Sequence, residues 1–293
     1  MTTPHVETFY HEPTHTFSYV AWDPATREAA VIDPVLDFSD VSGQTGTDSA
    51  DEILAFVARE ELRVAWILET HAHADHLTAA QYLQARTGAP IGIGAGIREV
   101  QTTFRELFNL GAELPADGSQ FDHLFADGDT FSVGGLTGRV MATPGHTNDS
   151  IAYRIGDDAV FVGDTLFRPD YGSARCDFPG GDAGRLYDSV RRLFELPPET
   201  RLFLCHDYPE EGTEPRSVTT VAEQRAENRH LNESVSRRDF VRMREQRDAG
   251  LGLPRLIIPA IQVNIRAGRM PRAEDNGVAY LKTPINAFPG SDQ

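Results

Sequence analysis

The sequence predicts an α/β protein in which two β-sheets pack together with helices on their outer faces. Strand-like and helix-like patterns alternate over the first 108 residues, and one apolar strand pattern leads into a loop that holds three histidines. From residue 127 onward the pattern changes to short β-rich runs separated by Gly, Asp and Pro, which indicates a second sheet. We therefore expect one large domain whose strand ends carry the functional residues.

The first half should contain a hairpin followed by alternating helices and strands. Residues 17–22 and 29–32 are β-rich runs joined by Asp23-Pro24-Ala25-Thr26, a turn composition, so they predict a hairpin. Residues 40–49 are rich in Gly, Ser, Thr and Asp and predict a surface loop. Apolar spacing then predicts a helix over 51–60, a strand over 64–68, a helix over 77–86, a strand over 91–94 and a helix over 98–108.

The second half should be β-rich and end in a helical, charged tail. Strands are predicted over 130–133, 136–143, 150–153 and 159–162, followed by a polar loop over 167–182, a helix over 183–194 and a strand over 201–204. From Val218 the pattern is helical to about Arg247, and it is followed by an apolar segment over 254–263 and a basic one over 266–271. We expect a catalytic unit over residues 1–215 and an extension over residues 216–293 that packs on the same domain.

The charge and composition exclude several classes of partner. The formal net charge of −17 at pH 7 would repel nucleic acid and an anionic membrane. Residues 1–7 lack the basic and apolar regions of a secretion signal, and no run approaches the roughly 18 apolar residues of a membrane span, so a cytoplasmic protein is expected. The two cysteines, Cys176 and Cys205, are expected to be free thiols, with Cys176 a wall residue of the site rather than a nucleophile.

The residues that carry chemistry lie at the ends of four apolar runs. The run at 64–68 leads into Thr70-His71-Ala72-His73-Ala74-Asp75-His76, which places three imidazoles and a carboxylate, the ligands of a borderline transition metal, within six residues. The alternative is a solvated histidine-rich loop. Three more apolar runs each end at a residue that can bind metal, namely His146, Asp164 and His206. These seven residues together predict a metal site, whereas His5, His11, His15, His123 and His230 are expected to be surface or core residues.

The succession of these motifs resembles that of the metallo-β-lactamase superfamily. The resemblance rests on the motif at 71–76, on Pro144-Gly145-His146-Thr147, on Gly163-Asp164-Thr165 and on His206-Asp207-Tyr208, and it runs from Phe17 to Tyr208. It implies an αββα sandwich with the metal at one edge of the two sheets. Aspartate at position 164, where the zinc β-lactamases carry cysteine, argues against antibiotic hydrolysis.

Within this superfamily the chain most resembles the persulfide dioxygenases, in particular their bacterial branch of β-lactamase-like hydrolases. The resemblance rests on Ala174-Arg175-Cys176-Asp177-Phe178-Pro179-Gly180-Gly181-Asp182-Ala183 and on the tail segment over 261–268. It implies oxidation of glutathione persulfide by O2 to glutathione and sulfite at a mononuclear non-haem iron, one Fe(II) per chain.

The same resemblance implies a role for each site residue. The iron ligands carry over to His71, His146 and Asp164, a set of two imidazoles and one carboxylate that leaves positions open for the persulfide sulfur and for oxygen. His73, Asp75, His76 and His206 would orient ligands and relay protons. The glutathione contacts carry over to Arg175, Asp177, Phe178 and Tyr208. For Arg175 the alternative is a guanidinium that only pins its loop to Asp177 or Asp182.

Two other functions stay open at this point. All seven ligands are also those of a dinuclear zinc thioesterase of the glyoxalase II type, in which Asp164 bridges the metals and Asp75, His76 and His206 hold the second one. A third alternative is a persulfide-binding protein without turnover. A sulfurtransferase that supplies persulfide is a natural partner hypothesis, and the sequence leaves a homo-oligomer open.

Overall fold

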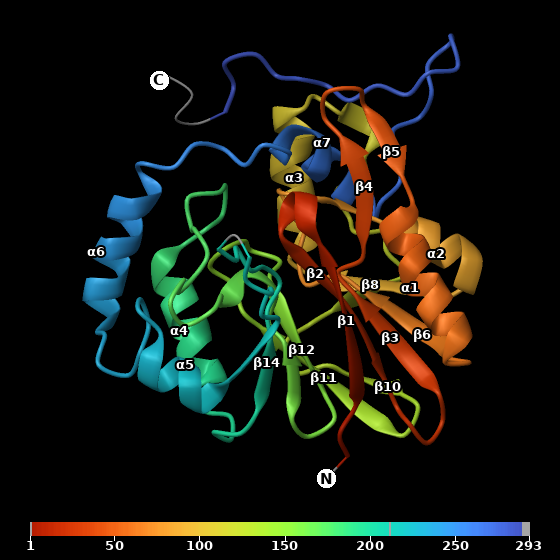
Figure 1. Ribbon diagram of the computed structural model, residues 1–293. Helices are drawn as coiled ribbons and strands as arrows, with labels where there is room; N and C mark the ends of the chain where they lie inside the picture. Colours follow the sequence, from red (N-terminus) through yellow and green to blue (C-terminus); the bar gives the residue numbers. More distant parts are fainter. Residues whose placement is uncertain (1, 211, 289–293) are drawn as a thin grey trace.

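Two six-stranded sheets face each other in the structure, which is a computed structural model that describes residues 2–210 and 212–288 (Figure 1). The first sheet has the order β1 (His5–His11), β2 (Thr16–Trp22), β3 (Glu28–Ile32), β6 (Arg63–Leu68), β8 (Ile91–Gly94) and β9 (His123–Phe125). The second has the order β10 (Thr130–Val133), β11 (Leu136–Ala142), β12 (Ile151–Ile155), β13 (Ala159–Phe161), β14 (Arg201–Phe203) and β15 (Val218–Thr220). A small sheet of β5 (Gln44–Gly46), β4 (Val35–Ser39) and β7 (Leu77–Thr78) lies beside the first.

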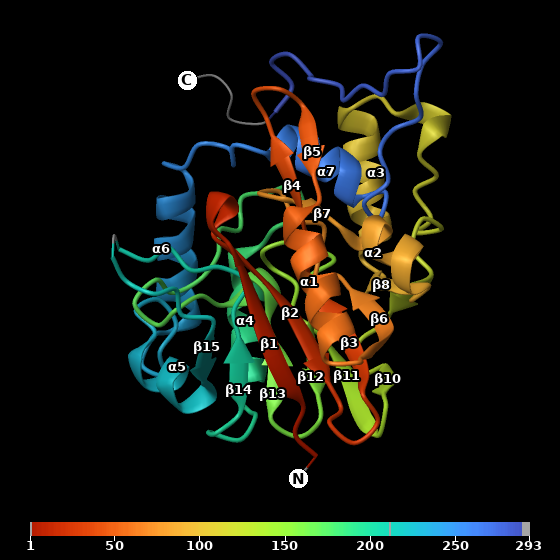
Figure 2. The same ribbon diagram turned by 45° about the vertical axis from the view of Figure 1, so that its right-hand side comes forward.

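Helices cover the outer face of each large sheet, so the predicted αββα sandwich is confirmed (Figures 1 and 2). The first sheet is covered by α1 (Asp48–Arg59), α2 (Ala80–Thr87), α3 (Ile97–Leu107) and α7 (Ile257–Asn264). The second is covered by α4 (Ala183–Leu193), α5 (Val221–Glu227) and α6 (Arg237–Asp248). Short 3-10 helices span Glu12–Thr14, Gly111–Glu113 and Gly163–Thr165. No helix within the described part of the chain has the length and apolar character needed to cross a membrane.

The strand β2 shows why the layers form. Side chains alternate across a strand, so Phe17, Tyr19 and Ala21 enter the core between the two sheets, whereas Val20 and Trp22 enter the core under the helices. All seven residues of this strand are buried. A strand that is apolar on both faces is stable only when both faces are covered, so the sequence of β2 requires a middle position in a layered fold.

The sheet topology brings the strand ends that precede the candidate ligands to one edge. The strands β3 and β6 are parallel, as are β13 and β14, so the loops that follow the members of each pair leave the sheet at the same end. The two sheets are joined there, because the Phe17 amide donates to the Cys205 carbonyl and the Ile151 amide donates to the Thr70 carbonyl. The loops that carry the predicted ligands therefore converge.

Several predicted elements need correction. The helix expected over 77–86 begins only at Ala80, because Leu77 and Thr78 pair with β4 as strand β7. The surface loop expected over 40–49 contains β5 and the first two residues of α1. The strand β1 was not predicted, since its half-buried residues are largely polar.

The tail after residue 215 also differs from the prediction. Residues 218–220 form strand β15 against β14 rather than the start of a helix. The helical pattern up to Arg247 is two helices, because the Asn228 side chain accepts the amides of His230 and Leu231 and ends α5. The helix α6 packs on α4, and α7 lies beside β7. The division into a unit over 1–215 and an extension stays a prediction, and residues 289–293 of that extension lie outside the described residues.

Candidate metal centre

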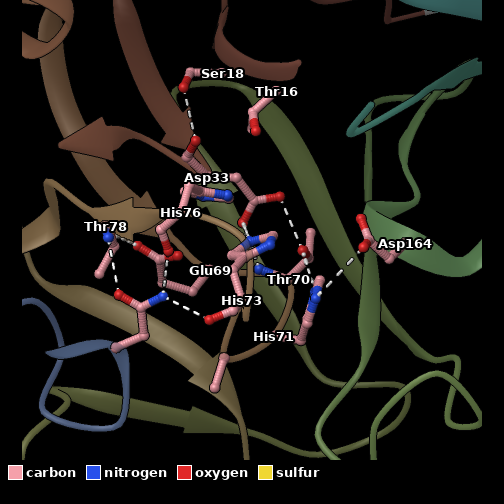
Figure 3. Close-up of polar contacts among 12 residues, drawn as sticks. Thr16, Ser18, Asp33, Glu69, Thr70, His71, His73, His76, Thr78 and Asp164 are labelled. Atoms are coloured by element: carbon pink, nitrogen blue, oxygen red, sulfur yellow. Dashed lines mark hydrogen bonds and ion pairs between the residues drawn. The ribbon is translucent and has the colours of Figure 1, made fainter. Parts of the chain in front are cut away.

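The four loops bring all seven predicted ligands together. The loop after β6 carries His71, His73, Asp75 and His76; the β11–β12 connection carries His146; and the segments after β13 and β14 carry Asp164 and His206. Figure 3 shows the imidazole of His71 pointing toward the Asp164 carboxylate, with His73 and His76 on the same loop. These seven residues are nearly all fully buried, and only Asp75 is partly exposed.

The first group of donor atoms belongs to His71, His146 and Asp164. Asp164 Oδ2 is 3.5 Å from His146 Nε2 and 4.0 Å from His71 Nε2, and one donor atom from each residue lies within 4.8 Å of the others. Ligands about 2.0–2.2 Å from a shared ion have separations in this range. The spacing is therefore that of a three-residue site for one metal ion.

A second group lies on the other side of Asp164. Asp75 Oδ2 is 3.3 Å from His206 Nε2 and 3.4 Å from His76 Nδ1, and the four residues His73, Asp75, His76 and His206 again place donor atoms within 4.8 Å of one another. Asp164 Oδ1 is 3.2 Å from His206 Nε2. Asp164 thus presents one oxygen to each group, so its carboxylate would be able to hold an ion on either side.

Unpartnered buried atoms show that this donor set fits a cation. Among the described residues, no group hydrogen-bonds to the buried atoms His71 Nε2, His76 Nε2 and Asp164 Oδ1, or to either ring nitrogen of His73. His73 Nε2 lies 3.1 Å from Asp33 Oδ1, but the two atoms are not aligned for a hydrogen bond. Burying such groups unsatisfied costs about 1–3 kcal/mol each, a cost that metal coordination removes. The residues therefore fit a metal cofactor.

Hydrogen bonds from neighbouring elements orient the rings. His146 Nδ1 donates to the Arg175 carbonyl at 2.7 Å, and His206 Nδ1 donates to the His15 carbonyl at 3.1 Å, which leaves Nε2 of each ring directed at Asp164. His71 Nδ1 lies 3.1 Å from Thr70 Oγ1, which itself donates to Asp33 Oδ2 at 2.8 Å. Such partners fix the tautomer that can bind a metal through the other nitrogen.

The protonation of the first group suits metal binding. The pKa of His71 is lowered well below its usual value, first by burial and then by the adjacent His73. Burial alone would raise the pKa of Asp164, but the neighbouring histidines, His206 above all, hold it well below the usual range. A neutral imidazole and an ionised carboxylate are the forms that bind metal.

Two histidines of the second group, His206 and His73, hold protons more tightly, whereas burial lowers the pKa of His76 to about 4. Burial lowers the pKa of His206, but the carboxylates of Asp164 and Asp75 outweigh it and raise the pKa to about 10. In the same way, Asp33 overcomes the burial of His73 and raises its pKa to about 9. A cation in the second group would have to displace a proton from His206.

Behind the loop lie buried acidic residues that the sequence patterns did not reveal. Asp33 accepts hydrogen bonds from the amide and the hydroxyl of Thr70, and Glu69 accepts one from the hydroxyl of Thr78. Burial raises the pKa of Glu69 to about 8. Asp33 follows the predicted hairpin and Glu69 precedes the histidine loop, but neither stands in a ligand-like motif, so only their packing shows that they support it.

A pocket of about 370 Å³ opens onto both groups. Its base contains Asp75, His146, Asp164 and His206, its walls include Phe167, Tyr171, Phe178 and Tyr208, and its basic residues are Arg175, Arg244 and Arg247. Three of the four predicted substrate contacts therefore line it. Asp177 does not; it lines a neighbouring pocket of about 540 Å³ together with Cys176. Cys176 and Cys205 are free, as expected, and both are buried, but Cys176 lines the neighbouring pocket rather than the metal pocket.

The guanidinium of Arg175 is already engaged within the protein. Its Nε and one terminal nitrogen donate to the two carboxylate oxygens of Asp177, each at 2.6 Å, and the other terminal nitrogen donates to the Gly252 carbonyl at 2.6 Å. It also lies 4.9 Å from the centre of the Phe178 ring. This bidentate arrangement favours the alternative in which Arg175 pins its loop to Asp177.

The helix α6 supplies two basic residues of the pocket that sequence reasoning missed. Arg244 is buried, and its guanidinium donates hydrogen bonds to the Asp248 carboxylate and to the Ser173 carbonyl. Arg247 is exposed and, within the described part of the chain, its guanidinium has no hydrogen-bond or ion-pair partner. No sequence motif marks either residue, because a charged helix usually faces solvent.

Buried imidazoles and carboxylates at the base of a pocket, on the edge of an αββα sandwich, define a metal-dependent enzyme. The chain belongs to the metallo-β-lactamase superfamily, whose family model matches residues 11–206.

Similar proteins carry different names. A protein of Burkholderia pseudomallei (strain 1710b) described as a probable metallo-hydrolase is 52% identical over 292 residues, covering 97% of this chain and 99% of the relative. Glyoxylase B2 of Dictyostelium discoideum is 45% identical over 282 residues, with coverage of 96% and 97%. Human mitochondrial persulfide dioxygenase ETHE1 is 30% identical over 255 residues, with coverage of 86% and 84%. The crystal structure of ETHE1 from Myxococcus xanthus superimposes with a TM-score of 0.72 at 34% identity, covering 90% of this chain and 100% of that one.

Proposed function

We propose that the protein is a persulfide dioxygenase that oxidises glutathione persulfide with O2 at a single iron held by His71, His146 and Asp164. The observation that carries the proposal is this donor set, two imidazoles and one carboxylate within 4.8 Å, at the base of a pocket with aromatic and basic walls. Two imidazoles and one carboxylate on one face are typical of non-haem iron enzymes that use O2. The similarity to human persulfide dioxygenase ETHE1 supports the same activity.

The reaction balances as one persulfide, one O2 and one water giving one thiol, one sulfite and two protons. The outer sulfur loses four electrons, O2 gains four, and the sulfur–sulfur bond breaks so that the thiol leaves. Bound iron(II) would supply the activation of O2 beside the sulfur. His206 lies 3.3 Å from Asp75 and 3.2 Å from Asp164, so it can hold a proton for the departing thiolate.

The pocket walls suit an anionic thiol. Three arginines line the pocket of a chain whose formal net charge is −17, but Arg175 and Arg244 are paired with Asp177 and Asp248, so the positive charge offered to a substrate is mainly that of Arg247. Arg247 has no partner among the described residues and is available for a substrate carboxylate, whereas Arg175 is held by Asp177. Phe178 and Tyr208 offer apolar surface for the peptide backbone and methylene groups of glutathione.

The second candidate is a dinuclear zinc thioesterase of the glyoxalase II type. The observation that favours it is the assembled second group, with Asp75, His76 and His206 on the far side of Asp164. The similarity to a relative named glyoxylase B2 points the same way. In this alternative a metal-bound hydroxide would be the nucleophile.

Metal analysis combined with two assays separates the candidates. For the dioxygenase we expect one iron per chain, oxygen uptake on glutathione persulfide and stoichiometric sulfite. Two zinc ions per chain and hydrolysis of S-lactoylglutathione without oxygen uptake would replace the proposal with the hydrolase. Bound metal with neither activity would indicate the persulfide-binding protein without turnover.

A further inference from the structure

The amide of Asn264 joins the C-terminal end of α7 to the metal-binding loop. Its Nδ2 donates to the carbonyl of His73 and to the carbonyl of His76, both at 2.8 Å, and its Oδ1 accepts the amide of Thr78 at 2.9 Å. The side chain is 3% exposed. Both Nδ2 hydrogens are therefore used, and all three contacts fall on residues 73–78 of the chain.

The loop needs such a partner because its own backbone is irregular. Residues 69–76 belong neither to β6 nor to β7, and nearly all of them are buried. Buried carbonyl groups outside regular structure must find donors elsewhere in the protein. Figure 3 shows His73, His76 and Thr78 around this part of the loop. One primary amide meets two carbonyls and one N–H at once, which neither a carboxylate nor an apolar side chain can do.

The position of Asn264 is itself fixed by packing. Ala260, Ile261 and Val263 of α7 lie in the core under the first sheet, and Gln101 of α3 donates to the Ile265 carbonyl at 2.9 Å. The chain then turns against the start of α2 at Gly268, where a Cβ atom would lie only 3.0 Å from the Thr78 carbonyl oxygen. The amide is thus held on a rigid support rather than on a free tail.

We propose that Asn264 is a positioning residue of the metal centre, through which α7 sets the backbone of the segment that carries His73, Asp75 and His76. The side chains of these three residues contribute to the second group of donors, next to Asp164. Loss of the amide frees the loop that also carries His71, whose ring centre lies 3.9 Å from that of His73, but it leaves His146 and Asp164, which other elements hold. The inference concerns this metal centre and does not depend on which reaction it performs.

The test compares two substitutions in the same helix. Asn264→Leu removes three hydrogen bonds to the loop and keeps the branching of the side chain at Cγ. Gln262→Leu is the matched control, because Gln262 is also buried and makes three hydrogen bonds, but to Ile258 and Lys282 and not to the metal loop. The readouts are Co(II) affinity, the visible absorption spectrum of the Co(II) form, and amide hydrogen exchange over residues 73–78.

We expect Asn264→Leu to weaken Co(II) binding about 10- to 100-fold, the usual effect of removing a group that orients ligands. Its Co(II) spectrum should change and its loop amides should exchange faster. Both variants should lower the melting temperature by similar amounts, because each loses three buried hydrogen bonds. Gln262→Leu should nevertheless keep its Co(II) affinity within about threefold of wild type.

Equal Co(II) affinity in the two variants, or a loss that follows melting temperature alone, would overturn the proposal. If Asn264→Leu is not recovered folded, the isosteric Asn264→Asp replaces it, since a carboxylate cannot donate to the His73 and His76 carbonyls. The same expectations apply to that variant. Oxygen uptake by the wild type is measured separately. The dioxygenase proposal can therefore fail without changing the conclusion drawn from the Co(II) affinities of the Asn264 and Gln262 variants.

Discussion

Replacement of Arg247 by methionine tests the substrate class directly. Arg247 lines the metal pocket from α6 and, among the described residues, no carboxylate pairs with its guanidinium. Methionine keeps much of the apolar stem and removes only the charge and the donors. We expect a higher KM for glutathione persulfide with little change in kcat, because this contact acts alike on the bound substrate and on the transition state.

The size of the effect follows from the exposure of the side chain. A hydrogen bond to a charged group contributes about 1.5–3 kcal/mol. Because Arg247 is exposed and screened by solvent, its contribution falls to about 1 kcal/mol, which corresponds to a roughly fivefold increase in KM. The increase should shrink at high salt, since an exposed charge pair is screened.

Steady-state oxygen uptake on glutathione persulfide gives KM and kcat, and metal occupancy is measured on the same preparations. Arg238→Met is the control, because Arg238 is exposed on the same helix but outside the pocket lining. Arg175→Met should behave differently and change kcat as well, since the loop that Arg175 pins provides the carbonyl that orients His146. An unchanged KM in Arg247→Met would refute recognition of a substrate carboxylate at this position.

Three further outcomes follow from the site and the core. His71→Ala should abolish iron binding, whereas His206→Ala should keep much of the iron by elemental analysis; equal losses would indicate a dinuclear site. Cys176→Ser should retain turnover in the oxygen electrode, because burial raises the pKa of this thiol far above its usual value and its side chain lines the neighbouring pocket. Burial, followed by nearby arginines, lowers the pKa of His230 from 6.5 to about 4. The folded state therefore favours the neutral ring, which contributes up to about 3 kcal/mol to the free energy of unfolding above pH 6.5. This contribution is lost as the pH falls toward 4. In urea unfolding at pH 4–7, His230→Gln should therefore lose less stability than wild type on acidification, and parallel curves would contradict the shift.

Much of the fold could be predicted from local patterns. The strand β6, the histidine loop after it and the strand β10 lie where apolar runs and turn residues put them. The short strand β7 could not be predicted, because Leu77 and Thr78 fit a helix locally and become a strand only by pairing with β4. Tertiary pairing outweighs a helix propensity of a few tenths of a kcal/mol per residue.

Local patterns were enough to predict the candidate metal ligands, since His71, His146, Asp164 and the others each follow an apolar run that ends at a sheet edge. The folded structure was needed to show that one oxygen of Asp164 faces each group, that Asp177 holds Arg175, and that Arg247 is left unpaired among the described residues. It also decided that Asn264, 191 positions from His73, supports the loop. A local pattern reports only what neighbours in the chain require, whereas these contacts depend on where distant segments pack.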